Sequence, residues 1–158
     1  MNGIPKLGVI YVPVFKTLYI GDVNANQSFK ADLEFHNTSF EEVESKLELL
    51  EPKSEDELIK VVGSRSHMNQ KTIDFIDNIK KDDKVEIVSK GSSLKFCLIA
   101  EGLADIYPRF APTMEWDTAS GQAICNALGI KVISQETNQS LLYNKESLLN
   151  PWFVVSKP

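Results

Sequence analysis

The segment Met114-Glu115-Trp116-Asp117-Thr118-Ala119-Ser120-Gly121 has the pattern of a turn that leads into a helix. Asp117 stands at the start of a run of small and apolar residues that ends at Gly129. Small residues recur every four positions in this run: Ala119, Ala123 and Ala127. Because residues at this spacing share one face of a helix, the pattern predicts a helix that another element can approach closely.

The carboxylate of Asp117 has two interpretations that this segment alone leaves open. Aspartate is a preferred helix N-cap, and the helix dipole favours a carboxylate in the first turn. The same position would also hold a carboxylate rigidly at the rim of a site, where it would serve as a Mg²⁺ ligand.

The composition is that of an ordinary globular domain. The 158 residues suit one domain with a real core, and the net charge of −5 argues against binding to the nucleic-acid backbone as the main activity. No apolar run approaches the roughly 20 residues that a membrane helix needs. Cys97 and Cys125 lie in apolar helical patterns, which predicts two buried thiols in a reducing cytoplasm. With only His36 and His67 beside them, a zinc site is not expected.

Three regions follow one another along the chain. Residues 1–22 contain two β-rich runs, residues 6–14 and 18–22, which predict a β-hairpin. Residues 23–57 form a polar variable region, in which residues 31–35 alternate like a strand. Four apolar residues in this region fit a helical face: Phe40, Val43, Leu47 and Leu50.

Residues 58–158 repeat the order strand, loop, helix three times. Strands are predicted at residues 59–62, 85–88, 104–107, 130–134 and 152–155. Helices are predicted after Asn69, from residues 91–93 to about Gly102, and from Asp117 to Gly129. The order predicts an α/β fold with a largely parallel sheet flanked by helices.

The three strand-to-helix loops carry the candidate site residues, because ligands of such sheets lie outside the carboxyl ends of the strands. The first loop offers Ser64, Arg65, Ser66 and His67; the second offers Gly91, Ser92, Ser93 and Lys95; the third offers Arg109 and then Asp117. Each arginine can hold a phosphate through a bidentate fork. Together these groups predict a phosphorylated ligand with a divalent cation.

Lys95 is the least expected residue of the second loop. It lies in the first turn of a predicted helix, where the dipole disfavours a cation. An anion held by the glycine and the two serines would relieve the conflict. The alternative is that a serine is an ordinary cap and Lys95 points to water, and the loop alone does not choose.

These motifs resemble a known family. Gly91–Gly102, Tyr107–Phe110 and Trp116–Gly121 are similar to the corresponding motifs of the inositol monophosphatase superfamily. The loop Gly63-Ser64-Arg65-Ser66-His67 and the turn Tyr107-Pro108-Arg109-Phe110 resemble its 3′(2′),5′-bisphosphate nucleotidase branch, of the CysQ type. The likeness covers essentially the whole chain and is weakest over residues 23–57.

The resemblance implies a Mg²⁺-dependent phosphatase that removes the 3′-phosphate of 3′-phosphoadenosine 5′-phosphate. It implies that Asp117 is a metal ligand and that the other loop residues bind substrate: Ser64, Arg65, His67, Gly91, Ser92, Ser93, Lys95 and Arg109. It also implies a place in sulfate assimilation and a cytoplasmic enzyme with possible peripheral association with the inner membrane.

The chain departs from the family pattern in its metal ligands. The family's Asp-x-x-Asp-Gly-Thr loop is absent from this sequence, as is the N-terminal half that carries it and a further glutamate. The chain is therefore expected to be a C-terminal half, to be inactive alone, and to need its missing half for the remaining Mg²⁺ ligands. The hairpin, expected to belong to the sheet of that half, would expose apolar edges and form a homo-oligomer through residues 7–20.

Three further functions stay open. An inositol or fructose bisphosphate phosphatase would use the same motifs. A non-catalytic nucleotide-binding module would explain the missing carboxylates. A plain scaffold would use the polar loops only as caps.

Overall fold

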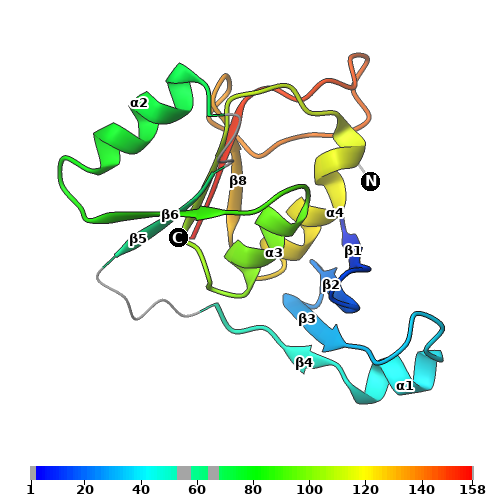
Figure 1. Ribbon diagram of the computed structural model, residues 1–158. Coiled ribbons are helices and arrows are strands. Elements are labelled where there is room, and N and C mark those ends of the chain that lie inside the picture. Colours follow the sequence, from blue (N-terminus) through cyan, green and yellow to red (C-terminus); the bar gives the residue numbers. More distant parts are fainter. Residues whose placement is uncertain (1–2, 53–57, 64–67, 158) are drawn as a thin grey trace.

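The computed structural model describes residues 3–52, 58–63 and 68–157 (Figure 1). Its elements form layers, with a small antiparallel sheet on one side and a larger mixed sheet on the other. Helices α3 (Leu94–Ala100) and α4 (Glu115–Asn126) lie between the two sheets, and α2 (Gln70–Ile79) covers the opposite face of the larger sheet. The predicted Ser64, Arg65 and His67 lie outside the described residues.

The small sheet has the strand order β1-β2-β3-β4. Its strands are β1 (Leu7–Val12), β2 (Thr17–Asp22), β3 (Gln27–Asp32) and β4 (Glu48–Leu49), and the short helix α1 (Phe40–Ser45) lies between the last two. The structure contains the expected hairpin as β1 and β2, which pair in antiparallel register from Leu7↔Asp22 to Val12↔Thr17. The hairpin thus continues into a meander of four strands.

Two predictions between residues 23 and 57 were wrong in their bounds. The third strand covers residues 27–32 instead of 31–35. The predicted helical face ends early, because the helix capped by Ser39 stops at Ser45. Leu49 pairs with Phe29 in the sheet, so strand pairing determines the conformation beyond the helix.

The large sheet has the strand order β6-β5-β7-β9-β8. Its strands are β5 (Ile59–Gly63), β6 (Val85–Ser89), β7 (Ile106–Arg109), β8 (Lys131–Ser134) and β9 (Phe153–Ser156). β5 is parallel to β6 and β7, whereas β9 is antiparallel to β7 and to β8. Four strands therefore share one direction, which confirms the α/β fold with a largely parallel sheet.

Two local predictions about this sheet and its helices need correction. β7 extends through Pro108 and Arg109, which were expected in a loop, because both pair with β9. Helix α4 begins at Glu115 with Met114 as its N-cap, so Asp117 is the third helical residue and not the first. The cap of α2 by Asn69 is as predicted, since its side chain accepts a hydrogen bond from the Thr72 N–H.

The main core lies between the large sheet and the central helices. Phe96 of α3 packs edge-to-face on Tyr107 and is stacked on Phe153, with ring centroids 5.4 and 6.0 Å apart. Cys97 and Cys125 are free and buried, as predicted. Burial raises the pKa of the Cys97 thiol to about 12, which keeps it protonated and poorly reactive. No helix among the described residues is long and apolar enough to cross a membrane.

Glycines allow α4 to lie directly on the small sheet. A Cβ atom at Gly8 would overlap the Ser120 carbonyl and come within 2.9 Å of Ala123, and one at Gly21 would come within 2.5 Å of Ile124 Cα. On another side of the helix, a Cβ at Gly121 would overlap the ring of Phe96. The predicted small-residue helix is thus approached closely from two sides.

We predict that Gly8→Ala destabilises the chain by about 1–3 kcal/mol, because the added methyl group meets the backbone of α4. Urea unfolding followed by circular dichroism measures the change. Gly91→Ala is the matched control, because a Cβ there has nothing within 4 Å. Equal stability of the two variants would contradict the close packing.

Candidate active site

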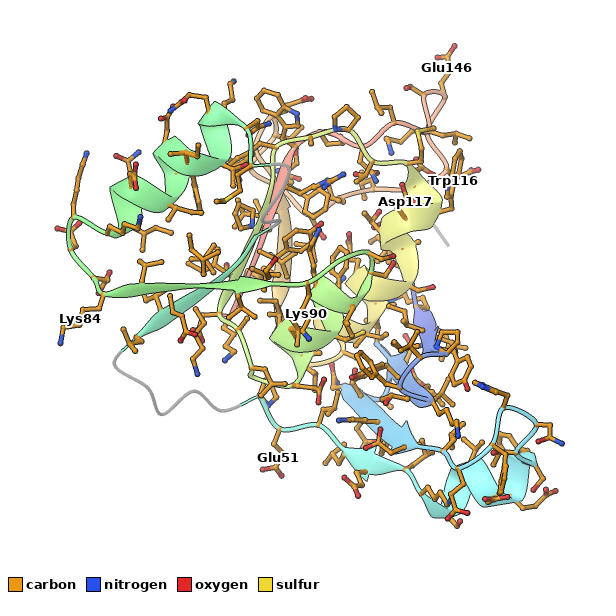
Figure 2. The ribbon with its side chains drawn as sticks, in the orientation of Figure 1. Glu51, Lys84, Lys90, Trp116, Asp117 and Glu146 are labelled. Carbon is orange, nitrogen blue, oxygen red and sulfur yellow. The ribbon has the colours of Figure 1, made fainter. Side chains whose placement is uncertain are left out.

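A cavity of about 260 Å³ lies where α3, α4 and the end of β7 meet. Its lining brings together residues from the second and third predicted loops: Ser92, Ser93, Lys95, Phe96, Tyr107, Arg109, Thr113, Asp117 and Thr118. Figure 2 shows Asp117 beside Trp116 on the first turn of α4. Gly91 precedes this group, is exposed, and does not line the cavity.

The two serines enter α3 through an unusual backbone. Ser92 has a φ of 52°, in the left-handed region that residues with side chains rarely adopt. Ser93 occupies the N-cap position, but its hydroxyl caps no backbone N–H of α3. It donates instead a long hydrogen bond of 3.4 Å to the carbonyl of Asp117. The two hydroxyls therefore lie at the cavity and do not serve as ordinary caps.

Lys95 is buried, with only 6% of its surface exposed. Its Nζ lies 5.1 Å from the ring centroid of Tyr107, and within the described residues it makes no hydrogen bond or ion pair. Burial, and secondarily the charge of Arg109, hold the pKa of Lys95 below its ordinary value. The alternative that this side chain points to water is therefore wrong. A buried cation without an anion is costly, so the cavity favours an anionic ligand.

Arg109 adds a second positive charge to the cavity. Its Nη2 donates to the Pro112 carbonyl at 3.0 Å, which orients the guanidinium. Its Nε is buried and has no hydrogen-bond partner among the described residues. A phosphate group would accept hydrogen bonds from both Arg109 and Lys95, since a guanidinium binds phosphate oxygens in pairs.

Asp117 is not the N-cap of α4, but its carboxylate stabilises the first turn and also lines the cavity. Its Oδ2 accepts a hydrogen bond of 2.9 Å from the N–H of Met114, which fixes the carboxylate at the first turn. Oδ1 accepts no hydrogen bond within the described chain and is free for a ligand at the cavity. The carboxylate thus holds the first turn of α4 and faces the site.

A network that sequence reasoning missed holds the first turn of α4. Asn150 is buried, and its Nδ2 donates to the Met114 carbonyl at 2.8 Å and to the Thr118 hydroxyl at 3.0 Å. The Glu115 carboxylate accepts hydrogen bonds from the backbone N–H and the side chain of Lys145. Because Asp117 lies between Glu115 and Thr118, these bonds orient it. The only sequence signal was the Asn-Pro pair after residue 149.

One turn further along α4, a second part of the network ties the helix to the segment that precedes β9. Gln122 is completely buried, and its amide donates to the Leu141 carbonyl at 3.0 Å. The Tyr143 hydroxyl donates to Gln122 Oε1 at 2.8 Å. One long loop therefore supplies hydrogen-bond partners for the polar side chains of the helix that carries the site.

A complete metal site is not formed by the described residues. They contain no group of three or more His, Cys, Asp or Glu side chains that could hold a metal ion. Mg²⁺ takes about six oxygen ligands, several of which are commonly water. Asp117 fits one position in such a shell, so these residues alone do not fit the metal that the resemblance implies.

The fold and the cavity agree with the comparisons to known proteins. The chain belongs to the inositol monophosphatase family, whose sequence model matches residues 1–154. Among its relatives, the 3′(2′),5′-bisphosphate nucleotidase CysQ of Salmonella typhimurium is 35% identical over 98% of this chain and 56% of its own length. The Buchnera aphidicola protein of the same description is 40% identical over 98% of this chain and 53% of its own.

Solved structures support the same relationship. The crystal structure of CysQ from Bacteroides thetaiotaomicron has a TM-score of 0.86 and 45% identity, and the match covers 99% of this chain and 59% of that one. SuhB of Mycobacterium tuberculosis, at 19% identity and a TM-score of 0.66, shows the shared fold. The chain spans about half the length of the curated relatives that it matches.

Because the Glu115 carboxylate is held in its charged form, we expect the stability of the chain to fall in acid. Burial acts to raise its pKa, but the hydrogen bonds from Lys145 and Asn144 outweigh burial and hold the pKa below 4.5. Its stabilising contribution is therefore fully present above pH 4.5 and is lost as the pH falls through the lower folded value. We predict that Glu115→Gln flattens the loss of stability below that pH.

Urea unfolding at a series of pH values, from about 7 to about 3, measures this effect. Glu146→Gln is the control, because Glu146 is exposed at the tip of the same loop. A parallel pH profile for the wild type and Glu115→Gln would contradict the assignment.

Proposed function

We propose that this chain carries the phosphate-binding part of a Mg²⁺-dependent 3′(2′),5′-bisphosphate nucleotidase. The full enzyme would hydrolyse 3′-phosphoadenosine 5′-phosphate to AMP and phosphate. The observation that carries the proposal is the pair of cations in the cavity, Lys95 and Arg109, which have no anionic partner among the described residues and lie with Asp117. The CysQ relatives support the choice of substrate class.

The residues of the chain would bind and orient the substrate. Lys95 and Arg109 would hold the phosphate oxygens and neutralise their charge, and the hydroxyls of Ser92 and Ser93 would donate to the same anion. Such preorganised donors, in a site shielded from water, stabilise the charge that develops on a phosphoryl group during transfer. Asp117 would supply one oxygen to the magnesium shell.

The remaining metal ligands are proposed to come from a part of the enzyme outside this chain. One carboxylate does not hold the magnesium ions that a phosphatase of this class would use. We therefore derive no step through the metal, and we propose that the chain by itself binds the nucleotide but does not hydrolyse it. A non-catalytic nucleotide-binding module is the second candidate, favoured by the lack of a metal cluster in the described residues.

Calorimetric titration of the purified chain with 3′-phosphoadenosine 5′-phosphate tests the proposed site. We predict that Lys95→Met weakens binding by about tenfold, because a charge-assisted hydrogen bond is lost. Lys84→Met is the matched control, since Lys84 is exposed and distant from the cavity (Figure 2). Equal binding by both variants, or no binding by the wild type, would contradict the proposal.

A phosphate-release assay tests the catalytic part of the proposal. With Mg²⁺ present, we expect no release from the chain alone, and release after the unmatched part of a CysQ relative is added. Release by the chain alone, abolished in Asp117→Asn, would show that it completes its own metal site. Phosphate release that starts only after this part is added would favour the nucleotidase over the non-catalytic binding module.

We also propose that the chain self-associates through the small sheet. β1 is an edge strand of this sheet, and the face turned away from α4 is apolar. Leu7, Val9 and Leu49 expose 64, 50 and 49% of their surface on that side. Exposed edges and apolar faces of this kind pair with other chains.

Sedimentation velocity over a range of concentrations measures self-association. We expect a dimer or higher oligomer that Val9→Lys disrupts, because the charge interrupts the apolar row. Ile73→Lys, on the exposed side of α2, is the control. A monomer at all concentrations would exclude this interface.

We also propose that the protein is located in the cytoplasm, in keeping with its two free thiols.

A further inference from the structure

Thr113 lies in the connector between β7 and α4, and it lines the cavity that contains Lys95 and Arg109. Its backbone carbonyl accepts a hydrogen bond of 2.8 Å from the N–H of Asn150. The residue before it is held as well, since the Pro112 carbonyl accepts from the Arg109 guanidinium at 3.0 Å. The side chain of Thr113 is therefore carried by a backbone that is fixed before any ligand binds.

The side-chain amide of Asn150 has one chemically acceptable orientation. Its Nδ2 lies 2.8 Å from the carbonyl oxygen of Met114, and a carbonyl oxygen can only accept a hydrogen bond. A flipped amide would bring two oxygen atoms together at this distance. Oδ1 is buried and has no hydrogen-bond partner among the described residues, so no donor favours the flipped form. Asn150 therefore presents its N–H donors to the connector.

The same amide nitrogen lies next to two threonine hydroxyls. Nδ2 of Asn150 is 3.3 Å from Oγ1 of Thr113 and 3.0 Å from Oγ1 of Thr118. A side-chain amide nitrogen donates hydrogen bonds and does not accept them, so the threonine oxygen is the acceptor in both pairs. Each hydroxyl group thus keeps its own hydrogen for another partner.

The two hydroxyl groups differ in where that hydrogen can go. Thr118 is buried, and its hydroxyl donates to the carbonyl of Glu115 at 3.3 Å. The Thr113 hydroxyl is at the cavity, and no described residue accepts a hydrogen bond from it. Asn150 therefore holds the Thr113 hydroxyl as a free donor, in a cavity whose two cations favour an anion.

We propose that Thr113 is a further phosphate-binding residue of this cavity and that Asn150 is its positioning residue. The Thr113 hydroxyl donates to an oxygen of the phosphate group that Lys95 and Arg109 attract. This role rests on the proposed function, because it adds a neutral donor to the same anion site. A donor that is already oriented and has no protein partner to give up binds an anion at little cost.

Calorimetric titration of the chain with inorganic phosphate tests the role of the hydroxyl. Thr113→Val replaces the hydroxyl by a methyl group and is expected to weaken phosphate binding by about tenfold, because a hydrogen bond to a charged group is lost. Thr113→Ser keeps the hydroxyl and should restore most of the affinity. Thr38→Val is the matched control, since Thr38 lies in the loop before α1, far from the cavity (Figure 1).

The proposal requires a difference between the two variants at position 113. Wild-type affinity in Thr113→Val would overturn it, because the hydroxyl would then make no contact with the anion. An equal loss of affinity in Thr113→Val and Thr113→Ser would overturn it as well, because the effect would then come from packing and not from the hydroxyl.

A double-mutant cycle tests Asn150 as the positioning residue. Asn150→Ala is expected to weaken phosphate binding in the wild-type background and much less in the Thr113→Val background, because the amide acts through the hydroxyl. Equal losses in the two backgrounds would overturn this role. Urea unfolding shows whether each variant is folded under the conditions of the titration. If Asn150→Ala does not fold, the two variants at position 113 still decide the role of the hydroxyl.

Lys95→Met separates the failure of this role from the failure of the proposed function. If Lys95→Met weakens phosphate binding and Thr113→Val does not, the anion site stands and only the role of Thr113 is overturned. The absence of phosphate binding by the wild type would overturn both.

Titration with 3′-phosphoadenosine 5′-phosphate identifies the group that the hydroxyl contacts. Thr113→Val is expected to weaken the binding of this nucleotide and of inorganic phosphate by the same factor, because the phosphate group is common to both. A loss seen with the nucleotide and not with inorganic phosphate would place the hydroxyl against the sugar and overturn the proposal.

Discussion

The direct contact between α4 and the small sheet is the constraint on which the site depends. Gly8 and Gly21 let the backbones of β1 and β2 approach the backbone of α4 at two points, and Gly121 lets the ring of Phe96 approach from α3. These contacts fix the distance of α4 from both neighbours. The first turn of the helix is thereby placed beside the end of β7 and the start of α3, where the cavity forms.

The chemistry of the cavity follows from what this packing leaves unpaired. Lys95 is buried against Tyr107, and Arg109 keeps a buried Nε without a partner in the described chain. The hydrogen bonds of Asn150 and Glu115 hold the first turn of α4 in place and thereby orient the carboxylate of Asp117. The cavity therefore holds two cations that favour an anionic ligand and one carboxylate with an oxygen free for a cation. In the proposed function these groups would supply electrostatic preorganisation for phosphoryl transfer.

Hydrophobic periodicity and capping residues predicted much of this arrangement. The Asn69 cap, the order of strands and helices after residue 58, and the meeting of the second and third loops all follow from local patterns. The strand conformation of Pro108 and Arg109 did not, because it depends on pairing with β9 far along the chain. The Asn150 network was missed for the same reason, since it joins residues that are distant in sequence.

The pKa of Lys95, followed by the Nζ chemical shift of selectively ¹⁵N-labelled lysine, tests the central claim most directly. Lys95→Met assigns the resonance. In the free chain the account predicts a pKa below the ordinary value of 10.5, because the ammonium group is buried without an anion. Saturation with inorganic phosphate should raise this pKa, because the anion stabilises the charged form. An ordinary pKa that phosphate does not change would contradict the account.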